Sequence, residues 1–232
     1  MGNTYYKWLR EDGSAIYGTG SWHLPTDNGP GEWMPHIEDI EPCKSGYHLC
    51  RQQDLVKWHG PSLYVSEARG EVLECDGKVI VHEARLVRRV EAWDERTSRL
   101  FAADCAERVL PIFESACPGD DRPRNAIEVA LRYAHGQATK DDLYAADDAA
   151  QAASWVARDA TGGARDAARA AARATTMPAA WAATTDATDA AAQAAAKAAS
   201  DATGGGRAAA RAAEREWQTQ HLLEMLEVEC DG

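Results

Sequence analysis

The stretch DATGGARDAARAAARA, residues 159–174, returns almost unchanged as DATGGGRAAARAAERE, residues 201–216. The offset is 42 residues, and 19 of the 27 positions over 147–173 are identical in the second copy. A fainter copy lies earlier, where RNAIEVALR at 124–132 matches RDAARAAAR at an offset of 41. A period near 42 residues with two helices per period is typical of stacked helical hairpins.

Helix start and stop signals divide the alanine-rich residues 97–232 into about six helices, or three stacked hairpins. Proline in a first turn costs little, because the first N–H groups have no partner within the helix. Glycine pairs mark helix ends. The first helix is expected at about 98–117. The second should start after Asp121, with Pro123 in its first turn, and the third after Thr139. The fourth should end at about Thr176, the fifth should start at Pro178, and Gly204–Gly206 should precede the sixth.

Residues 1–96 have a different composition, with five of the eight tryptophans and several strand-like runs. The clearest local signal is EVLECDGKVIVHEARLV at 71–87, where Asp76-Gly77 separates two β-branched runs and predicts a type I′ hairpin. We therefore predict an α+β protein. Its domains are a small, mostly β unit at 1–96 and an alanine-rich, all-α array at 97–232.

The charge balance narrows the range of partners. The chain carries 37 acidic and 25 basic residues, a net charge of -12, and the excess is spread evenly along it. Nucleic-acid binding needs a positive surface, so we expect neither nucleic acid nor an anionic membrane as a partner. The first residues lack the apolar core of a secretory signal. We expect a protein of the bacterial cytoplasm whose six cysteines are reduced.

The run PCKSGYHLC at 42–50 raises the question of a metal site. Cys43, His48, Cys50 and His59 can supply four zinc ligands, but the two cysteines are seven positions apart, whereas structural zinc sites usually space them more closely. In the alternative interpretation the cysteines pack as small apolar residues and His48 hydrogen-bonds locally. We expect no cofactor, with zinc or NAD as the alternatives.

A second candidate site in this half combines His48, Tyr64, Glu67 and Glu83 with the Trp-rich segment 22–35. A histidine, a carboxylate and an aromatic wall can grip a nucleotide-like ligand or exchange protons with a substrate. Small β domains also use tryptophan and histidine simply as core and rim, and that interpretation stays open.

In the helical half, arginines recur at equivalent places of the repeat and predict a ridge that binds a partner. In the alternative interpretation they pair with aspartates of neighbouring helices, such as Asp147, Asp159, Asp189 or Asp201, or are simply solvated. The candidate binding residues are Arg124, Arg132, Arg165, Arg169, Arg173, Arg207, Arg211 and Arg215.

Residues 4–90 resemble a small uncharacterised domain of phage and prophage proteins, on the strength of the Cys-x-x-Gly-aromatic-His-x-Cys run from Cys43 to Cys50. The order of helix, strand, glutamate and hairpin over 51–90 is also similar to the ADP-ribosyltransferase-like fold. That similarity implies His48, Tyr64 and Glu67 or Glu83 as residues that hold NAD.

The helical half resembles immunity proteins of bacterial polymorphic-toxin systems. The resemblance rests on DRPRNAIEVALRYAHGQAT at 121–139, the alanine-rich helices and a final helix with tryptophan. It implies an all-helical protein that neutralises a toxin by binding it. Our leading expectation is a non-enzymatic binding protein of phage or prophage origin whose helical array contacts a protein partner. The alternatives are an ADP-ribosyltransferase-like enzyme in the N-terminal domain and a zinc-stabilised structural module.

Overall fold

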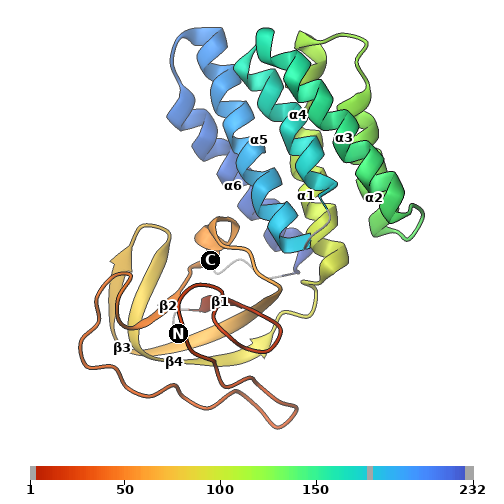
Figure 1. Ribbon diagram of the computed structural model, residues 1–232. Coiled ribbons are helices and arrows are strands. Elements are labelled where there is room, and N and C mark those ends of the chain that lie inside the picture. Colours follow the sequence, from red (N-terminus) through yellow and green to blue (C-terminus); the bar gives the residue numbers. More distant parts are fainter. Residues whose placement is uncertain (1–3, 177–179, 228–232) are drawn as a thin grey trace. The chain divides into compact units, whose positions relative to one another are not determined.

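The structure, a computed structural model, describes residues 4–176 and 180–227. The chain forms two units, Met1–Asp94 and Glu95–Gly232, called unit 1 and unit 2 below. Figure 1 shows strands in unit 1 and helices in unit 2. The predicted fold class, a small β-rich part followed by about six helices, is confirmed.

Unit 1 is a four-stranded antiparallel sheet. The strands are β1 (Tyr5–Leu9), β2 (Tyr47–Leu49), β3 (Ser62–Cys75) and β4 (Lys78–Arg89), in the order β1-β3-β4-β2, with a 3₁₀ helix η1 (Gln52–Lys57) before β3. Tyr6 and Cys50 exchange two backbone hydrogen bonds of 2.9 Å. The sheet therefore curls until its two edges meet, which leaves fewer unpaired edge groups.

The strand-like runs of the sequence form these strands because their alternate side chains fill one core. Tyr5 and Leu9 of β1 pack there with Leu49, Tyr64 and Trp22. Trp22 belongs to the Pro/Gly/Trp-rich segment, so that tryptophan is buried core rather than the wall of a pocket. Burying an aromatic side chain of this size is a main source of stability in a small domain.

The β3–β4 hairpin is confirmed, but its predicted turn type is wrong. Cys75 pairs with Lys78 across the two-residue turn Asp76-Gly77. Gly77 has a φ of 72°, whereas Asp76 is not among the residues with positive φ. A type I′ turn needs positive φ at both central positions, and a type II turn needs it only at the second. A single glycine in second place therefore satisfies this turn.

The described residues of unit 2 form six α-helices, and most of them begin and end close to the predicted places, although the third ends at Val156, before Gly162-Gly163. They are α1 (Glu95–Ala116), α2 (Arg122–Ala134), α3 (Lys140–Val156), α4 (Gly162–Ala174), α5 (Ala180–Thr203) and α6 (Arg207–Met225), with a 3₁₀ turn η2 (Ala157–Asp159) after α3. Thr139 forms a capping box with Asp142 at the start of α3. Pro178, the predicted start of the fifth helix, lies outside the described residues.

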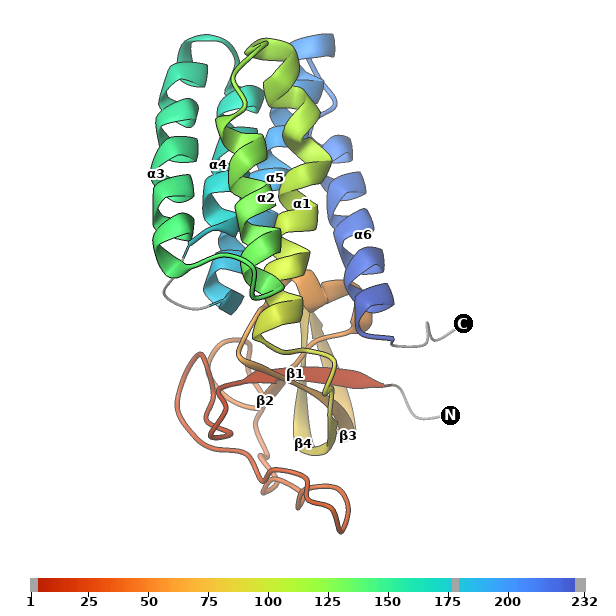
Figure 2. The ribbon, with the colours of Figure 1, turned by 90° about the vertical axis from the view of Figure 1, so that its right-hand side faces the viewer.

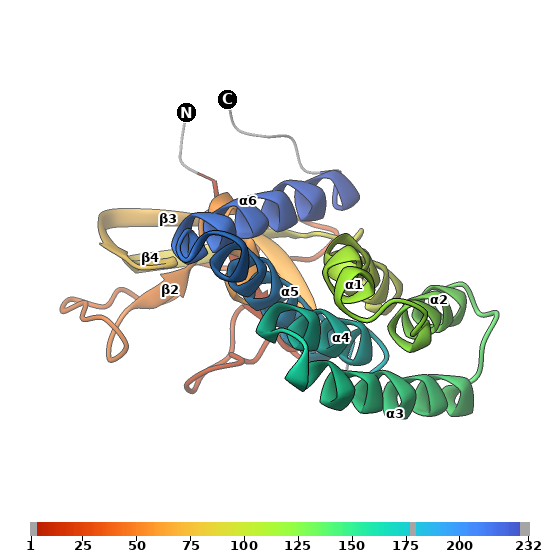
Figure 3. The same cartoon turned by 90° about the horizontal axis from the view of Figure 1, so that it is seen from above.

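The helices of unit 2 form two layers. α3, α4, α5 and α6 lie in a row, and α1 and α2 pack against it (Figures 2 and 3). α1 contacts both α4 and α5, and α2 contacts both α3 and α4. The two hairpins that carry the sequence repeat are therefore neighbours within one layer. Equivalent helices of the repeat have different neighbours, because α4 lies inside the row and α6 ends it.

The repeat glycines show this difference at atomic scale. A Cβ atom on Gly163 of α4 would lie 3.1 Å from the Ala198 backbone nitrogen and 3.3 Å from the Ala194 carbonyl oxygen of α5. Gly205, its counterpart 42 residues later, has no atom within 4 Å of that position. Gly163 therefore lets α4 and α5 approach closely, which their alanine-rich surfaces need in order to pack.

We expect Gly163→Val to destabilise the protein by about 1–3 kcal/mol, because the added carbons meet the α5 backbone. The matched variant Gly205→Val should change the free energy of unfolding by less than about 0.5 kcal/mol, as surface substitutions usually do. Urea denaturation of both variants measures the difference. Equal effects of the two substitutions would mean that α4 and α5 do not pack this closely.

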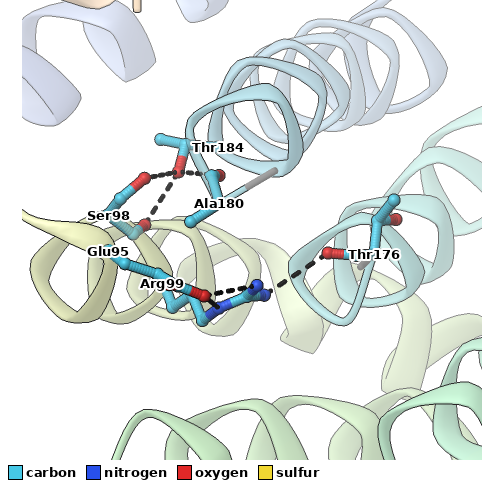
Figure 4. Close-up of polar contacts among 6 residues, drawn as sticks. All are labelled: Glu95, Ser98, Arg99, Thr176, Ala180 and Thr184. Atoms are coloured by element: carbon cyan, nitrogen blue, oxygen red, sulfur yellow. Dashed lines mark hydrogen bonds and ion pairs between the residues drawn. The ribbon is translucent and has the colours of Figure 1, made fainter. Parts of the chain in front are cut away.

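A polar cluster ties α1 to the neighbouring row (Figure 4). The Ser98 and Thr184 hydroxyl oxygens lie 2.7 Å apart, and both side chains are buried. At the next position of α1 the Arg99 guanidinium is also buried, and it donates to Glu95 Oε1 over 3.1 and 3.0 Å. It lies 3.4 Å from the Thr176 carbonyl oxygen beyond the end of α4.

Candidate functional site

Helices α3 and α4 border a groove of about 370 Å³ on unit 2. Three of its residues come from the predicted arginine ridge on α4, and the rest come mainly from α3. The lining residues are Gln151, Ser154, Trp155, Arg158, Arg165, Arg169, Ala172 and Arg173. None of these lining residues is acidic.

The sequence of α3 explains why it presents an aromatic side chain to solvent. Its buried stripe contains Leu143, Ala146 and Ala150, at the spacing of one helix face. Trp155 lies off this stripe and is 68% exposed, and Tyr144, eleven residues or about three turns earlier, is 55% exposed. A tryptophan outside the apolar stripe of an alanine-rich helix is a signal that the sequence prediction missed.

Two of the three arginines of α4 share one buried carboxylate. Asp166 is 1% exposed, and its oxygens lie 2.5 Å from Lys197 Nζ, 3.5 Å from Arg165 and 3.7 Å from Arg169. Arg173 lies 3.5 Å from the exposed Asp186. One carboxylate cannot balance three cations, so the groove keeps a positive charge on a protein whose net charge is -12.

The other predicted arginines have different surroundings. Arg124 pairs with Glu114 at 2.6 Å, and Arg132 donates to the Gln137 carbonyl oxygen at 3.1 Å. Arg215 pairs with Asp189, as the ion-pair interpretation predicts. Arg207 and Arg211 are exposed on the first turns of α6.

The expected aspartate partners are only partly used. Asp147 accepts a hydrogen bond from Gln151 at 2.8 Å, and its burial raises the pKa of its carboxyl group. The side chain of Asp159 lies outside the described part of the chain. Asp201 is exposed at the end of α5. The ridge is therefore local to α4, where three of the eight candidates line one groove.

The four predicted zinc ligands line one cavity of unit 1 but do not form a metal-binding group. Cys50 is buried and its thiol donates to the Tyr6 carbonyl oxygen over 3.3 Å, whereas Cys43 is exposed. His48 Nε2 accepts a hydrogen bond from the Cys43 backbone N–H at 3.3 Å, and His59 packs beside Trp8. Among the described residues, no group of three or more His, Cys, Asp and Glu side chains can hold a metal ion.

The predicted nucleotide-binding residues lie apart. Of the four, only His48 lines the cavity of unit 1 described below. Tyr64 is buried in the core, Glu67 bonds to Arg85 at 2.8 Å, and Glu83 lies 3.0 Å from His36 Nδ1. Alternate strand residues point to opposite faces, which separates side chains that are close in sequence.

Unit 1 instead holds an unusual lysine. Lys7 Nζ donates to the His48 carbonyl oxygen at 2.8 Å, and it faces Cys50, Lys78 and His48. Burial, opposed by Cys50 and assisted by Lys78, lowers the pKa of Lys7 to about 8 from its ordinary 10.5. Burial and the charges of Lys78 and Lys7 also lower the pKa of His48.

The lowered pKa of Lys7 predicts that the effect of Lys7 on the free energy of unfolding depends on pH. Below about pH 8 both the folded and the unfolded chain carry the proton, and the full cost of burying the charge is present. Between about pH 8 and 10.5 the folded chain releases the proton first, so stability rises with pH. Burial raises the pKa of the Cys50 thiol from its ordinary 9.0 to about 12, so its contribution to stability falls above about pH 9, but this contribution is common to the wild type and a Lys7 variant and largely cancels in their difference.

We therefore expect Lys7→Met to be more stable than the wild type below pH 8. The difference between the two free energies of unfolding should decline towards pH 10.5. Urea denaturation of both proteins across this range measures the difference. A difference that stays constant with pH would contradict the buried charge of Lys7.

Comparison with known proteins covers the helical part. The family model described as "Imm-5 like putative immunity protein" matches residues 88–225, more than half of the chain, and the match ends at the last residue of α6. No curated protein and no solved structure gives a significant match. The phage-domain resemblance of residues 4–90 stays a prediction. In the described ranges, none of the helices combines the length and apolar character needed to cross a bilayer.

Proposed function

The chain belongs to the family of Imm-5 like putative immunity proteins, and from this premise we propose that it neutralises a protein toxin by binding it. The action is non-enzymatic and stoichiometric, and unit 2 supplies the binding surface. The observation that carries the choice of surface is the α3–α4 groove, where exposed Trp155 lies among four arginines.

The composition of the groove supports its role in protein recognition. Tryptophan and arginine are the residues most enriched among those that contribute strongly to protein–protein binding. An indole offers a large rigid apolar surface, and a guanidinium can hold a carboxylate with two parallel hydrogen bonds. The groove therefore fits a partner segment in which an apolar side chain is flanked by carboxylates.

Electrostatics supports the same partner chemistry. Among the described residues, Arg165 and Arg169 lie 3.5 and 3.7 Å from Asp166, which is shared with Lys197, and Arg173 lies 3.5 Å from Asp186. A carboxylate of the partner would therefore gain charge-assisted hydrogen bonds without first breaking strong ones. The rest of the acidic chain would repel a wrongly placed acidic partner, which favours one orientation.

We also propose a setting for this activity. We propose that the two units are separate domains, that the protein acts in the cytoplasm of the producing bacterium, and that unit 1 derives from a phage-type domain. The five described cysteines are all free thiols, which supports a reducing compartment.

The test begins with the full chain as bait in an extract of the producing bacterium. An unrelated acidic protein of similar size serves as the control bait, and a protein retained only by this chain is the candidate partner. That protein is then expressed in a laboratory bacterium with and without this chain. We expect expression of that protein alone to stop growth. Co-expression of this chain should restore growth only when the chain is present in at least an equal molar amount, because each molecule neutralises one molecule of toxin.

Two results would contradict the proposal. Protection by far less than one equivalent of this chain would indicate turnover, and therefore an enzyme. A retained partner whose expression leaves growth unchanged would leave the protein a binding module without an immunity role.

A further inference from the structure

Unit 1 contains a cavity of about 550 Å³, and every residue that lines it belongs to this unit. It lies where β1 meets the segment 43–50, at the seam that closes the curled sheet. Its lining includes Tyr6, Lys7 and Trp8 of β1 and His48, the middle residue of β2. A volume of several hundred cubic ångströms is typical of a small-molecule site.

One part of the cavity wall is cationic. Lys7 Nζ lies 2.8 Å from the His48 carbonyl oxygen, and Lys78 Nζ lies 3.1 Å from Cys43 Sγ. The lining also includes Lys44, which pairs with Glu41 at 2.6 Å. The lining contains no aspartate or glutamate, and within the described ranges neither Lys7 nor Lys78 has an ion pair with a carboxylate.

Another part of the wall is aromatic. Tyr17 is 69% exposed and meets the Trp58 ring edge to face, with centroids 5.7 Å apart. The Trp58 indole N–H donates to the Gly77 carbonyl oxygen at 2.8 Å, which fixes the orientation of its ring. Lys78 Nζ lies 5.9 Å from the centre of that ring, so the aromatic and cationic parts adjoin.

Keeping Lys7 and Lys78 in the cavity wall without a carboxylate partner lowers the stability of unit 1. Burial lowers the pKa of Lys7 and of His48, so their charged forms are poorly solvated. Groups kept in such surroundings within a cavity are more common at binding sites than elsewhere. An anion placed between Lys7 and Lys78 would offset the cost.

We propose that this cavity binds a small organic anion that carries a flat aromatic ring and has about the size of a mononucleotide. Its phosphate or carboxylate group lies between Lys7 and Lys78, and its ring packs against Trp58 and Tyr17. This site is in unit 1 and is independent of the toxin-binding surface proposed for unit 2.

Nitrogen-15 spectra of the full chain test the proposal, with AMP and 4-hydroxyphenylacetate as phosphate and carboxylate probes. Adenosine lacks the anionic group, and inorganic phosphate lacks the ring. We expect the Trp58 indole N–H signal to shift with a Kd below about 1 mM for at least one aromatic anion. Adenosine and phosphate should bind about tenfold more weakly or worse, because each meets only one part of the wall. The Trp155 signal of unit 2 should not move.

Variants separate this site from a general attraction to lysine. Lys78→Met and Lys7→Met should each weaken binding of the responding anion about tenfold or more, because each removes a charge-assisted hydrogen bond. Lys44→Met is the matched control, since Lys44 lines the same cavity but already pairs with Glu41. It should change the Kd less than about threefold.

Three results would overturn the proposal. The first is that neither aromatic anion shifts the Trp58 signal at about 10 mM, a concentration at which a site of useful affinity would be occupied. The second is that adenosine binds as tightly as AMP and, in the same series, inorganic phosphate binds as tightly as AMP or 4-hydroxyphenylacetate. The third is an equal loss of affinity in Lys78→Met and Lys44→Met, with both variants retaining the wild-type spectrum.

Discussion

Trp155→Ala is expected to weaken binding of the protein partner by about 30-fold or more, because truncation of a central aromatic anchor typically costs at least 2 kcal/mol. Trp155 is 68% exposed in the free protein and lines the groove with its four arginines. Calorimetric titration of the partner identified by the bait experiment measures the Kd. Thermal unfolding of the variant should change little, since an exposed side chain contributes little to the core.

Neighbouring residues supply controls for this prediction. Val156 is 61% exposed on the same helix but does not line the groove, so Val156→Ala should change the Kd less than about twofold. Arg169→Glu places a negative charge in the groove, and Arg211→Glu makes the same change at the equivalent position on α6. We expect only the first of these two to abolish binding of an acidic partner segment.

These four variants together test whether the partner binds in the α3–α4 groove. Equal losses in Arg169→Glu and Arg211→Glu would indicate a long-range effect of net charge rather than contact in the groove. Loss in Val156→Ala but not in Trp155→Ala would place the partner elsewhere on α3. Either result would remove the groove from the proposed function while leaving the immunity role to be tested by growth.

Glu95→Ala is expected to destabilise the protein by about 2 kcal/mol, because it leaves the buried guanidinium of Arg99 without a carboxylate; Glu95 itself is 69% exposed, so the loss is smaller than for a fully buried pair. The Arg99 side chain is 4% exposed, and it bonds to Glu95 Oε1 over 3.0 and 3.1 Å (Figure 4). The remaining contacts, the Thr176 carbonyl oxygen and the Tyr133 ring, cannot neutralise the charge. Urea denaturation at neutral pH measures the loss.

A second ion pair on the same helix gives the matched control. Glu114 pairs with Arg124, whose side chain is 47% exposed, so Glu114→Ala should cost less than about 1 kcal/mol. The double variant Glu95→Ala with Arg99→Met should recover most of the lost stability, since an apolar chain of similar length needs no counter-ion. Failure of this rescue would attribute the loss to the start of α1, where a glutamate favours the helix dipole.

The helices of unit 2 were largely predictable because their signals are local. Thr139 starts α3 through a capping box, and α6 begins directly after Gly206, which has a φ of 78°. In unit 1 the Asp76-Gly77 dipeptide located the hairpin but not its turn type. These features depend on residues only a few positions apart, so the sequence contains the information.

The candidate sites were less predictable, because they depend on neighbours distant in the chain. His48 of β2, Tyr64 and Glu67 of β3 and Glu83 of β4 belong to strands that pair in one sheet, yet their side chains have different surroundings. The β3–β4 pairing shifts register near Val65 and again after Arg69, and such irregularities change which side chains share a face. Lys7 and Lys78, which line the same cavity, are separated by most of unit 1.

By itself the sequence determined the α+β class, the number of helices and the resemblance of the helical part to immunity proteins, since periodicity, caps and glycines act within a few turns. Only the tertiary structure decided which copy of the repeat can form a site. Arg169 and Arg211 occupy the same place in two nearly identical sequences, but α4 lies between α3 and α5 while α6 ends the row. The neighbours of a helix depend on the packing of the whole bundle, and the same residue therefore lines a groove in one copy and is merely exposed in the other.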